Sequence, residues 1–159
     1  MSRILFVCTG NTCRSPMAEA ILNHRSKGTF EAKSAGLFAA PGNPASEQTV
    51  EVLYQEGIPI DHTSKPLTKD LIDWSDFILT MTEQHKQSIV MQAPGLGKRV
   101  YTVKEFVERE TTNETVSENN GLSLDVSDPY GGHADIYRQT FKELDALISK
   151  LVKETKKHS

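Results

Sequence analysis

A cysteine and an arginine bracket a short polar loop near the start of the chain. Cys8 directly follows an apolar run at residues 4–7, and Arg14 lies six positions further on. The apolar run is typical of a buried strand. Ser15 followed by Pro16 predicts that a helix starts directly after the loop, with Ser15 as its N-terminal cap. Such a loop turns backbone N–H groups inward and the helix adds the positive end of its dipole, so the sequence predicts a concave anion site.

The chemistry that this anion site suits is attack on a phosphoryl group. Positive potential stabilises a thiolate, which makes Cys8 a candidate nucleophile at the floor of the site. Arg14 offers a planar pair of donors to two phosphate oxygens. A free cysteine is elsewhere most often a small buried residue, but its position beside Arg14 at one anion site favours the chemical role. The Ser15 hydroxyl is also able to donate to the Cys8 sulfur.

Two short motifs give the chain a resemblance to a known family. The loop has the pattern C-x5-R-S with Gly10 and Asn11 inside it, and it resembles the active-site loop of the low-molecular-weight protein tyrosine phosphatases. The tripeptide Asp-Pro-Tyr at 128–130 resembles the general-acid loop of that family, in its usual place before the last helix. The resemblance covers nearly the whole chain, apart from an extended segment around residues 108–127.

This resemblance implies an enzyme that uses neither a metal nor another cofactor. Cys8 would attack phosphorus and form a phosphocysteine, Arg14 would hold the equatorial oxygens, and Asp128 would protonate the leaving group. Phosphorylated proteins would be the substrates and partners. The expected substrate-binding residues are the rest of the loop and one aromatic residue of the acid loop: Thr9, Gly10, Asn11, Thr12, Cys13, Ser15 and Tyr130.

The choice of substrate depends on two positions. In tyrosine-specific members of the family an aliphatic residue typically stands where this chain has Thr12, and a second aromatic residue often stands where it has Gly131. A hydroxyl near a carboxylate suits a desolvated guanidinium, which needs hydrogen-bond acceptors. Within the family these features resemble the bacterial protein-arginine phosphatases. We therefore expect phosphoarginine as the substrate, with phosphotyrosine as the alternative, and Tyr130 is compatible with both.

Two other functions share parts of the pattern. A thioredoxin-coupled arsenate reductase has the same fold but uses further cysteines downstream, and none follows Cys13 here. A non-catalytic module that binds phosphorylated residues would lack the nucleophile or the acid, yet both Cys8 and Asp128 are present. The role of Cys13 stays open, because a buried inert thiol fits as well as a redox partner that forms a reversible disulfide with Cys8.

Length and composition limit the remaining possibilities. A chain of 159 residues suits a single domain over residues 1–159. A net charge of −3 gives no basic footprint for nucleic acid. The absence of a long apolar run or of a signal peptide in the sequence predicts a cytoplasmic protein without a membrane span. The histidines have no metal-ligand spacing, and we expect His62, His85 and His133 to be structural or surface residues. The oligomeric state is left open.

Strands alternate with helices along the chain, which predicts an α/β fold. We expect a three-layer architecture in which a small parallel sheet of about four strands carries helices on both faces. Ligands of such folds bind beyond the carboxyl ends of the strands, where the loop after the first strand lies and where 128–133 is expected. The acidic segment 108–127 is expected to be irregular. The expected strands are 4–7, 30–35, 77–81 and a short one from residue 100, and the expected helices are 16–27, 46–56, 68–74, 82–93 and 135–156.

Overall fold

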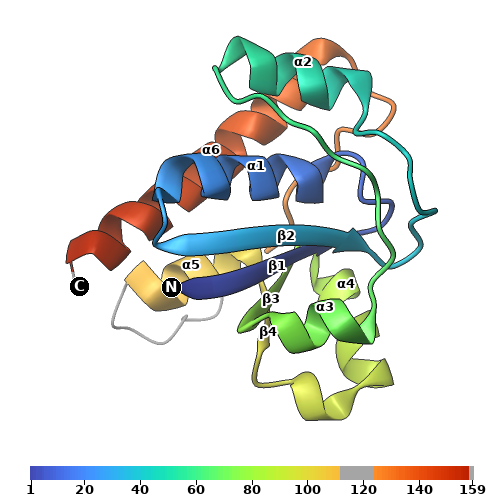
Figure 1. The fold of residues 1–159 in the computed structure, drawn as a ribbon, viewed down its shortest axis with the longest axis vertical. Coiled ribbons are helices and arrows are strands. Elements are labelled where there is room, and N and C mark those ends of the chain that lie inside the picture. Colours follow the sequence, from blue (N-terminus) through green and yellow to red (C-terminus); the bar gives the residue numbers. More distant parts are fainter. Residues whose placement is uncertain (112–123, 158–159) are drawn as a thin grey trace.

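A sheet of four parallel strands lies at the centre of the computed structural model, which describes residues 1–111 and 124–157 (Figure 1). Strand β1 (Ser2–Cys8) lies between β2 (Phe30–Gly36) and β3 (Phe77–Thr80). Strand β4 (Val100–Thr102) pairs with the outer side of β3, so the order is β2-β1-β3-β4. The small parallel sheet predicted from the sequence is confirmed, and its first strand is an inner one.

Helices cover both faces of this sheet, as predicted. In Figure 1, α1, α2 and α6 lie above the sheet and α3 and α4 lie below it. Side chains of α5 belong to the same hydrophobic cluster as those of α1 and α6, and α2 packs on α6. The helices on the first side are α1 (Arg14–Ser26), α2 (Glu47–Gln55), α5 (Val103–Thr111) and α6 (Ala134–Lys157), and those on the second are α3 (Lys69–Trp74), α4 (Glu83–Gln92) and the short 3-10 helix η1 (Pro94–Leu96).

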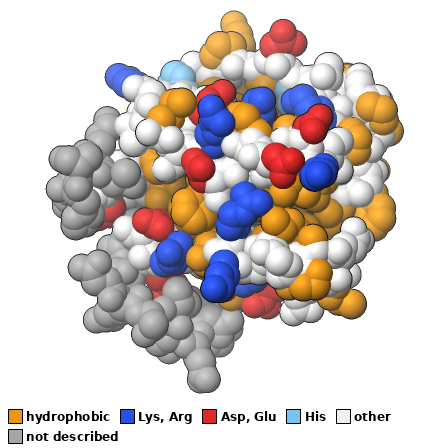
Figure 2. All heavy atoms as spheres, turned by 60° about the horizontal axis from the view of Figure 1, so that its bottom comes forward, with side chains coloured by type: hydrophobic (Ala, Val, Ile, Leu, Met, Phe, Trp, Pro, Cys, Tyr) orange, Lys and Arg blue, Asp and Glu red, His pale blue; other side chains and the backbone are white. Residues whose placement is uncertain are grey.

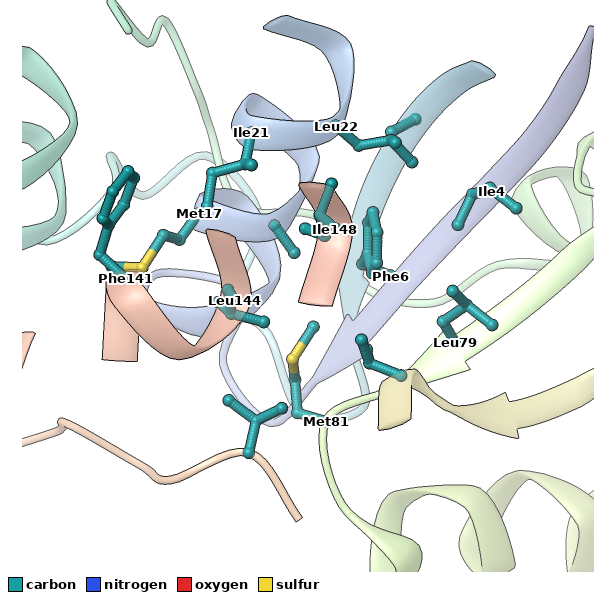
Figure 3. Close-up of a cluster of buried hydrophobic side chains, with 14 of the residues drawn as sticks. Ile4, Phe6, Met17, Ile21, Leu22, Leu79, Met81, Phe141, Leu144 and Ile148 are labelled. Carbon is teal, nitrogen blue, oxygen red and sulfur yellow. The ribbon is translucent and has the colours of Figure 1, made fainter. Parts of the chain in front are cut away.

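Strand β1 contributes to a hydrophobic core on each face of the sheet. Ile4 and Phe6 join the larger core, where they meet side chains of α1 and α6 such as Leu144 (Figure 3). Leu5 and Val7 join the smaller core on the side of α3 and α4. All four side chains are fully buried, which explains why this strand is a continuous apolar run in the sequence. The end of β1, and with it the loop that follows, is therefore fixed between two packed layers.

The side that carries α3 and α4 has a mixed surface. Figure 2 shows Lys, Arg, Asp and Glu side chains interspersed with hydrophobic ones there. Two cations cover the ring of Trp74: Lys33 Nζ lies 4.6 Å and the Arg3 guanidinium carbon 5.9 Å from its centroid. Such cation–π contacts shield a half-buried aromatic residue from water. None of the described helices combines the length and the apolar composition that crossing a membrane requires.

The helix starts differ in whether a side chain caps them. Thr68 and Thr82 cap α3 and α4, since their hydroxyls accept from the N–H groups of Leu71 (3.3 Å) and His85 (3.0 Å). The prediction that Ser15 caps α1 is wrong. The helix begins at Arg14, two residues before the predicted start at Pro16, and no side chain caps it. The Ser15 hydroxyl is engaged inside the preceding loop and is not available to the helix end.

Helix α5 was not predicted, and it occupies the start of the segment expected to be irregular. It follows β4 without an intervening loop. Thr102 and Glu105 form a reciprocal pair at its start: the Thr102 hydroxyl accepts from Glu105 N–H at 3.1 Å, and the Glu105 carboxylate accepts from Thr102 N–H at 2.9 Å. This T-x-x-E capping box is a helix-start signal in the sequence. Of the acidic segment 108–127, residues 112–123 lie outside the described part of the chain.

The packing of α6 on the larger core gives a stability prediction. Leu144 is fully buried there, so Leu144→Ala leaves a cavity and is expected to lower the free energy of unfolding by about 2–5 kcal/mol. Urea unfolding followed by circular dichroism measures the loss. Met91→Ala on α4 is the control, because its side chain is 80% exposed and the change is expected to stay within about 0.5 kcal/mol. Equal midpoints for the two variants would contradict this account of the core.

Candidate active site

The loop between β1 and α1 is held from behind by Asn11. This residue is fully buried and has φ of 58°, a left-handed conformation that asparagine tolerates. Its side-chain amide donates to Ser15 Oγ at 2.8 Å and to Ser34 Oγ at 2.9 Å. Its side-chain oxygen accepts from Lys65 N–H at 2.9 Å, and its carbonyl accepts from His62 Nε2 at 2.8 Å. One residue thus ties the loop to α1, to β2 and to the segment before α3.

The Cys8 sulfur lies among hydrogen-bonding groups at the start of the loop. Ser15 Oγ is 2.8 Å away, and Asn11 N–H donates to the sulfur at 3.3 Å. The side chain is almost wholly buried yet lines a cavity that opens to solvent. The contact with Ser15 agrees with the expectation that this hydroxyl donates a hydrogen bond to the Cys8 sulfur. A hydroxyl and an amide N–H are groups from which a negatively charged sulfur accepts hydrogen bonds.

A glycine on β2 lets the loop approach the sheet closely. A Cβ atom on Gly36 would lie 2.6 Å from the Thr9 carbonyl oxygen and 3.0 Å from Asn11 N. The chain after Gly36 follows the loop, and Phe38 N–H donates to the Thr9 carbonyl at 3.0 Å. No side chain fits between these backbones, so the glycine is required by close approach and not by its dihedral angles.

Arg14 connects the loop to the segment that carries the candidate acid. Its guanidinium is buried and donates to the Val126 carbonyl at 3.0 Å. A second guanidinium nitrogen lies 3.5 Å from the Asp128 carboxylate, whose side chain is 56% exposed. Val126 N–H in turn donates to the carbonyl of Met81, directly after β3, at 2.8 Å. The segment at 124–130 therefore lies at the carboxyl edge of the sheet, the edge at which the sequence predicted the loop 128–133.

These elements enclose a cavity of about 240 Å³. Asn11 and Ser15 lie behind its wall and are fully buried. Tyr130 projects at the rim and is 81% exposed, and its N–H donates to Asp128 at 3.0 Å. The structure thus brings together most of the residues that the sequence singled out, since the cavity is lined by Cys8, Thr9, Gly10, Thr12, Cys13, Arg14, Asp128 and Tyr130.

Cys13 is buried on the side of the loop that faces α6. Its sulfur lies 3.5 Å from Tyr137 Oη and 3.6 Å from Ser46 Oγ. Burial, together with the hydrogen bond to Cys13, raises the pKa of Tyr137 to about 12. The phenol is therefore protonated at neutral pH and able to donate to the sulfur. A disulfide between Cys8 and Cys13 stays a prediction.

Three residues at the loop were not singled out from the sequence as parts of the site. Ser34 and His62 bond to Asn11, and His85 Nε2 lies 2.9 Å from the Thr9 hydroxyl. Burial lowers the pKa of His85, and nearby Arg14 lowers it further. Nothing in their local sequence marks these residues. Only the sheet order, which places β3 beside β1, predicts that the start of α4 lies near the loop.

A thiol and an arginine on one strand-to-helix loop, facing a carboxylate across a cavity, define the class of cysteine-dependent phosphatases. Residues 3–159 match the family described as low molecular weight phosphotyrosine protein phosphatase. The chain belongs to this family.

Similar proteins include members named for two different substrates. A protein-arginine-phosphatase of Bacillus subtilis is 43% identical over 157 residues, which is 97% of each chain. The crystal structure of a low molecular weight protein tyrosine phosphatase from T. tengcongensis is 47% identical, covers 96% of this chain and 99% of its own, and has a TM-score of 0.83. A YwlE arginine phosphatase variant with a phosphorylated active-site serine is 42% identical, covers 98% of this chain and 96% of its own, and has a TM-score of 0.82.

The close approach at Gly36 gives a prediction for the loop. Gly36→Ala forces the loop backbone to move, so we expect a loss of about 1–3 kcal/mol in stability and weaker binding of inorganic phosphate. Isothermal titration calorimetry with phosphate and urea unfolding measure both effects. Gly95→Ala in η1 is the matched control, because its Cβ would meet no atom within 4 Å. Unchanged phosphate binding in Gly36→Ala would show that the loop adapts without cost.

Proposed function

We propose that this chain is a protein-arginine phosphatase, which removes phosphate from phosphoarginine residues of proteins through a phosphocysteine intermediate. The observation that carries the proposal is the cavity in which Cys8, Arg14 and Asp128 meet, with Thr12 on its wall. The name of the Bacillus subtilis relative supports the choice of substrate. Phosphotyrosine is the alternative, because the family description and a neighbour of similar identity name tyrosine.

The first chemical step is assigned to Cys8. Its sulfur attacks phosphorus in line with the bond from phosphorus to the guanidine nitrogen, so an S–P bond forms as the P–N bond breaks. The inward N–H groups of the loop and the Arg14 guanidinium would hold the three equatorial oxygens as charge builds up on them. The related YwlE variant with a phosphorylated active-site serine supports a covalent intermediate of this kind.

Proton transfer is assigned to Asp128. In the first step its carboxyl protonates the departing guanidine nitrogen, and in the second it accepts a proton from the water that attacks the phosphocysteine. Phosphate and the free thiolate are then the products, and the carboxyl regains its proton for the next turnover. The support is its place on the cavity wall, with a half-exposed side chain that lies within reach of both substrate and water.

The choice of phosphoarginine depends on the polarity of the cavity entrance. The Thr12 hydroxyl and the carbonyl oxygen of the protonated Asp128 carboxyl are acceptors for guanidinium N–H groups, and Tyr130 offers a flat face at the rim. Gly131 has φ of 78°, which a bulky side chain rarely adopts. A second aromatic residue at this position would therefore be strained, and the entrance has one aromatic wall where tyrosine-specific members often have two.

Three broader predictions accompany this function. Phosphorylated proteins are the proposed partners, in keeping with the family. A single domain over residues 1–159 and a cytoplasmic location stay predictions from the sequence.

Cys8→Ser is expected to abolish turnover, because a serine hydroxyl is a far weaker nucleophile at neutral pH. The loop amides and Arg14 remain, so the variant is expected to retain phosphate binding. Steady-state kinetics on a phosphoarginine peptide and calorimetry with inorganic phosphate measure the two effects. Activity within about tenfold of the wild type would exclude Cys8 as the nucleophile.

Thr12→Ile tests the choice of substrate. It removes an acceptor, and a buried guanidinium donor left unpaired costs about 1–3 kcal/mol, so we expect kcat/KM for a phosphoarginine peptide to fall about tenfold or more. The matched phosphotyrosine peptide is expected to react equally well or faster, because the isoleucine adds apolar surface. Thr12→Ser keeps the hydroxyl and is the control. A parallel fall for both peptides would instead assign Thr12 to loop shape and favour a tyrosine phosphatase.

A further inference from the structure

A buried histidine contacts the residue that follows the nucleophile, and the mechanism above does not use it. His85 lies in the first turn of α4, where its backbone N–H is held by the Thr82 cap. The residue is 8% exposed, and its Nε2 lies 2.9 Å from the Thr9 hydroxyl. Its Nδ1 is buried and has no hydrogen-bond partner in the part of the chain that the structure describes. Because the ring is buried and has one hydrogen-bond partner, its surroundings determine which nitrogen carries the proton.

The surroundings of the ring favour its neutral form with the proton on Nε2. Burial and the nearby Arg14 lower the pKa of His85, while Asp125 and Asp128 act against this shift. A neutral ring carries one N–H. If that proton were on Nδ1, a buried donor would have no acceptor, which is rarer in proteins than an unpaired acceptor. With the proton on Nε2, the ring donates to Thr9 Oγ1 and leaves the hydroxyl proton of Thr9 unused.

Thr9 lies at the catalytic cavity, where its hydroxyl proton is able to reach a bound phosphoryl group. A second cavity of about 360 Å³ borders the catalytic cavity, and Thr9, Arg14 and Asp128 line both. His85 lines only the second of these cavities, so the ring contacts Thr9 without forming part of the catalytic cavity. If the ring donates to Thr9 Oγ1, the proton of that hydroxyl is left for another acceptor, and Thr9 also lines the catalytic cavity.

We propose that His85 is a positioning residue of the phosphatase: its Nε2–H fixes the Thr9 hydroxyl so that this hydroxyl donates to an oxygen of the bound phosphoryl group. The proposal rests on the proposed phosphatase function but not on the choice between phosphoarginine and phosphotyrosine, because every phosphoryl substrate presents the same oxygens. Thr9 would then add a side-chain donor to those of the loop backbone and Arg14.

The test uses para-nitrophenyl phosphate as a generic substrate and inorganic phosphate as a competitive inhibitor. Thr9→Val removes the hydroxyl but keeps the side-chain shape, and it is expected to lower kcat/KM and weaken phosphate inhibition, each by about tenfold, because the lost bond goes to a charged group. His85→Ala is expected to behave alike. His85→Gln places a neutral amide N–H near the position of Nε2 and is expected to restore activity to within about threefold of the wild type. His24→Ala, an exposed histidine on α1, is the control.

Coupling between the two positions separates this role from a purely structural one. If His85 acts through Thr9, the double variant Thr9→Val with His85→Ala is no worse than Thr9→Val alone. Additive losses, or His85→Gln no better than His85→Ala, would overturn the proposal. Nitrogen NMR of the wild-type ring at neutral pH decides independently of any variant's folding, because a proton on Nδ1 together with an unprotonated Nε2 excludes the donation to Thr9. Failure of the phosphatase function itself is distinguishable, since the wild type would then not hydrolyse the generic substrate.

Discussion

The site depends on the conformation of the loop between β1 and α1, whose backbone N–H groups are predicted to face the anion cavity and which is held in place from outside. Backbone N–H groups that face an anion cavity have no partners in secondary structure, so the chain conformation needs another source of stability. Asn11 supplies it through side-chain bonds to Ser15, Ser34 and Lys65 from a left-handed conformation. Each of these buried groups would cost about 1–3 kcal/mol if left unpaired. The donors are therefore oriented before a substrate arrives, which is the arrangement that stabilises developing charge most strongly.

The acid segment is attached to this rigid loop in a different way. Its described contacts with the loop and with the edge of the sheet run through Arg14, the backbone of Val126 and the side chain of Asp125, which accepts from Glu83 N–H at 2.9 Å. Arg14 lies 3.5 Å from Asp128, and a bound phosphoryl group would compete for the same guanidinium. Binding would then free the carboxyl to face the leaving group. The same arginine would thus link occupation of the cavity to the position of the acid.

The sequence predicted those parts of the site that lie close together along the chain. Cys8 and Arg14 belong to one loop, so their spacing and the flanking pattern were enough to place both at an anion site. Asp128 was found through its family motif. Ser34 lies on β2 and His85 on α4, and both contact the loop only because of the tertiary arrangement. The spacing of residues along the chain does not predict such contacts. Ser15 was assigned both to the helix end and to the Cys8 sulfur, and only the second contact is present, because the pattern Ser-Pro does not tell which partner the hydroxyl takes.

The two candidate substrates pay unequal costs at the wrong wall: a guanidinium at an apolar wall loses more than an aryl ring at a polar one. An aliphatic wall offers nothing to a guanidinium, whose desolvated N–H groups would remain unpaired. A wall with the Thr12 hydroxyl and the Asp128 carboxyl accepts hydrogen bonds from those N–H groups. It loses less when a neutral ring enters, because an open rim lets water solvate the acceptors. Tyr130 is largely exposed and Gly131 carries no side chain, so the entrance here is open. Such a site would favour phosphoarginine strongly through satisfied donors while rejecting an aryl phosphate only weakly.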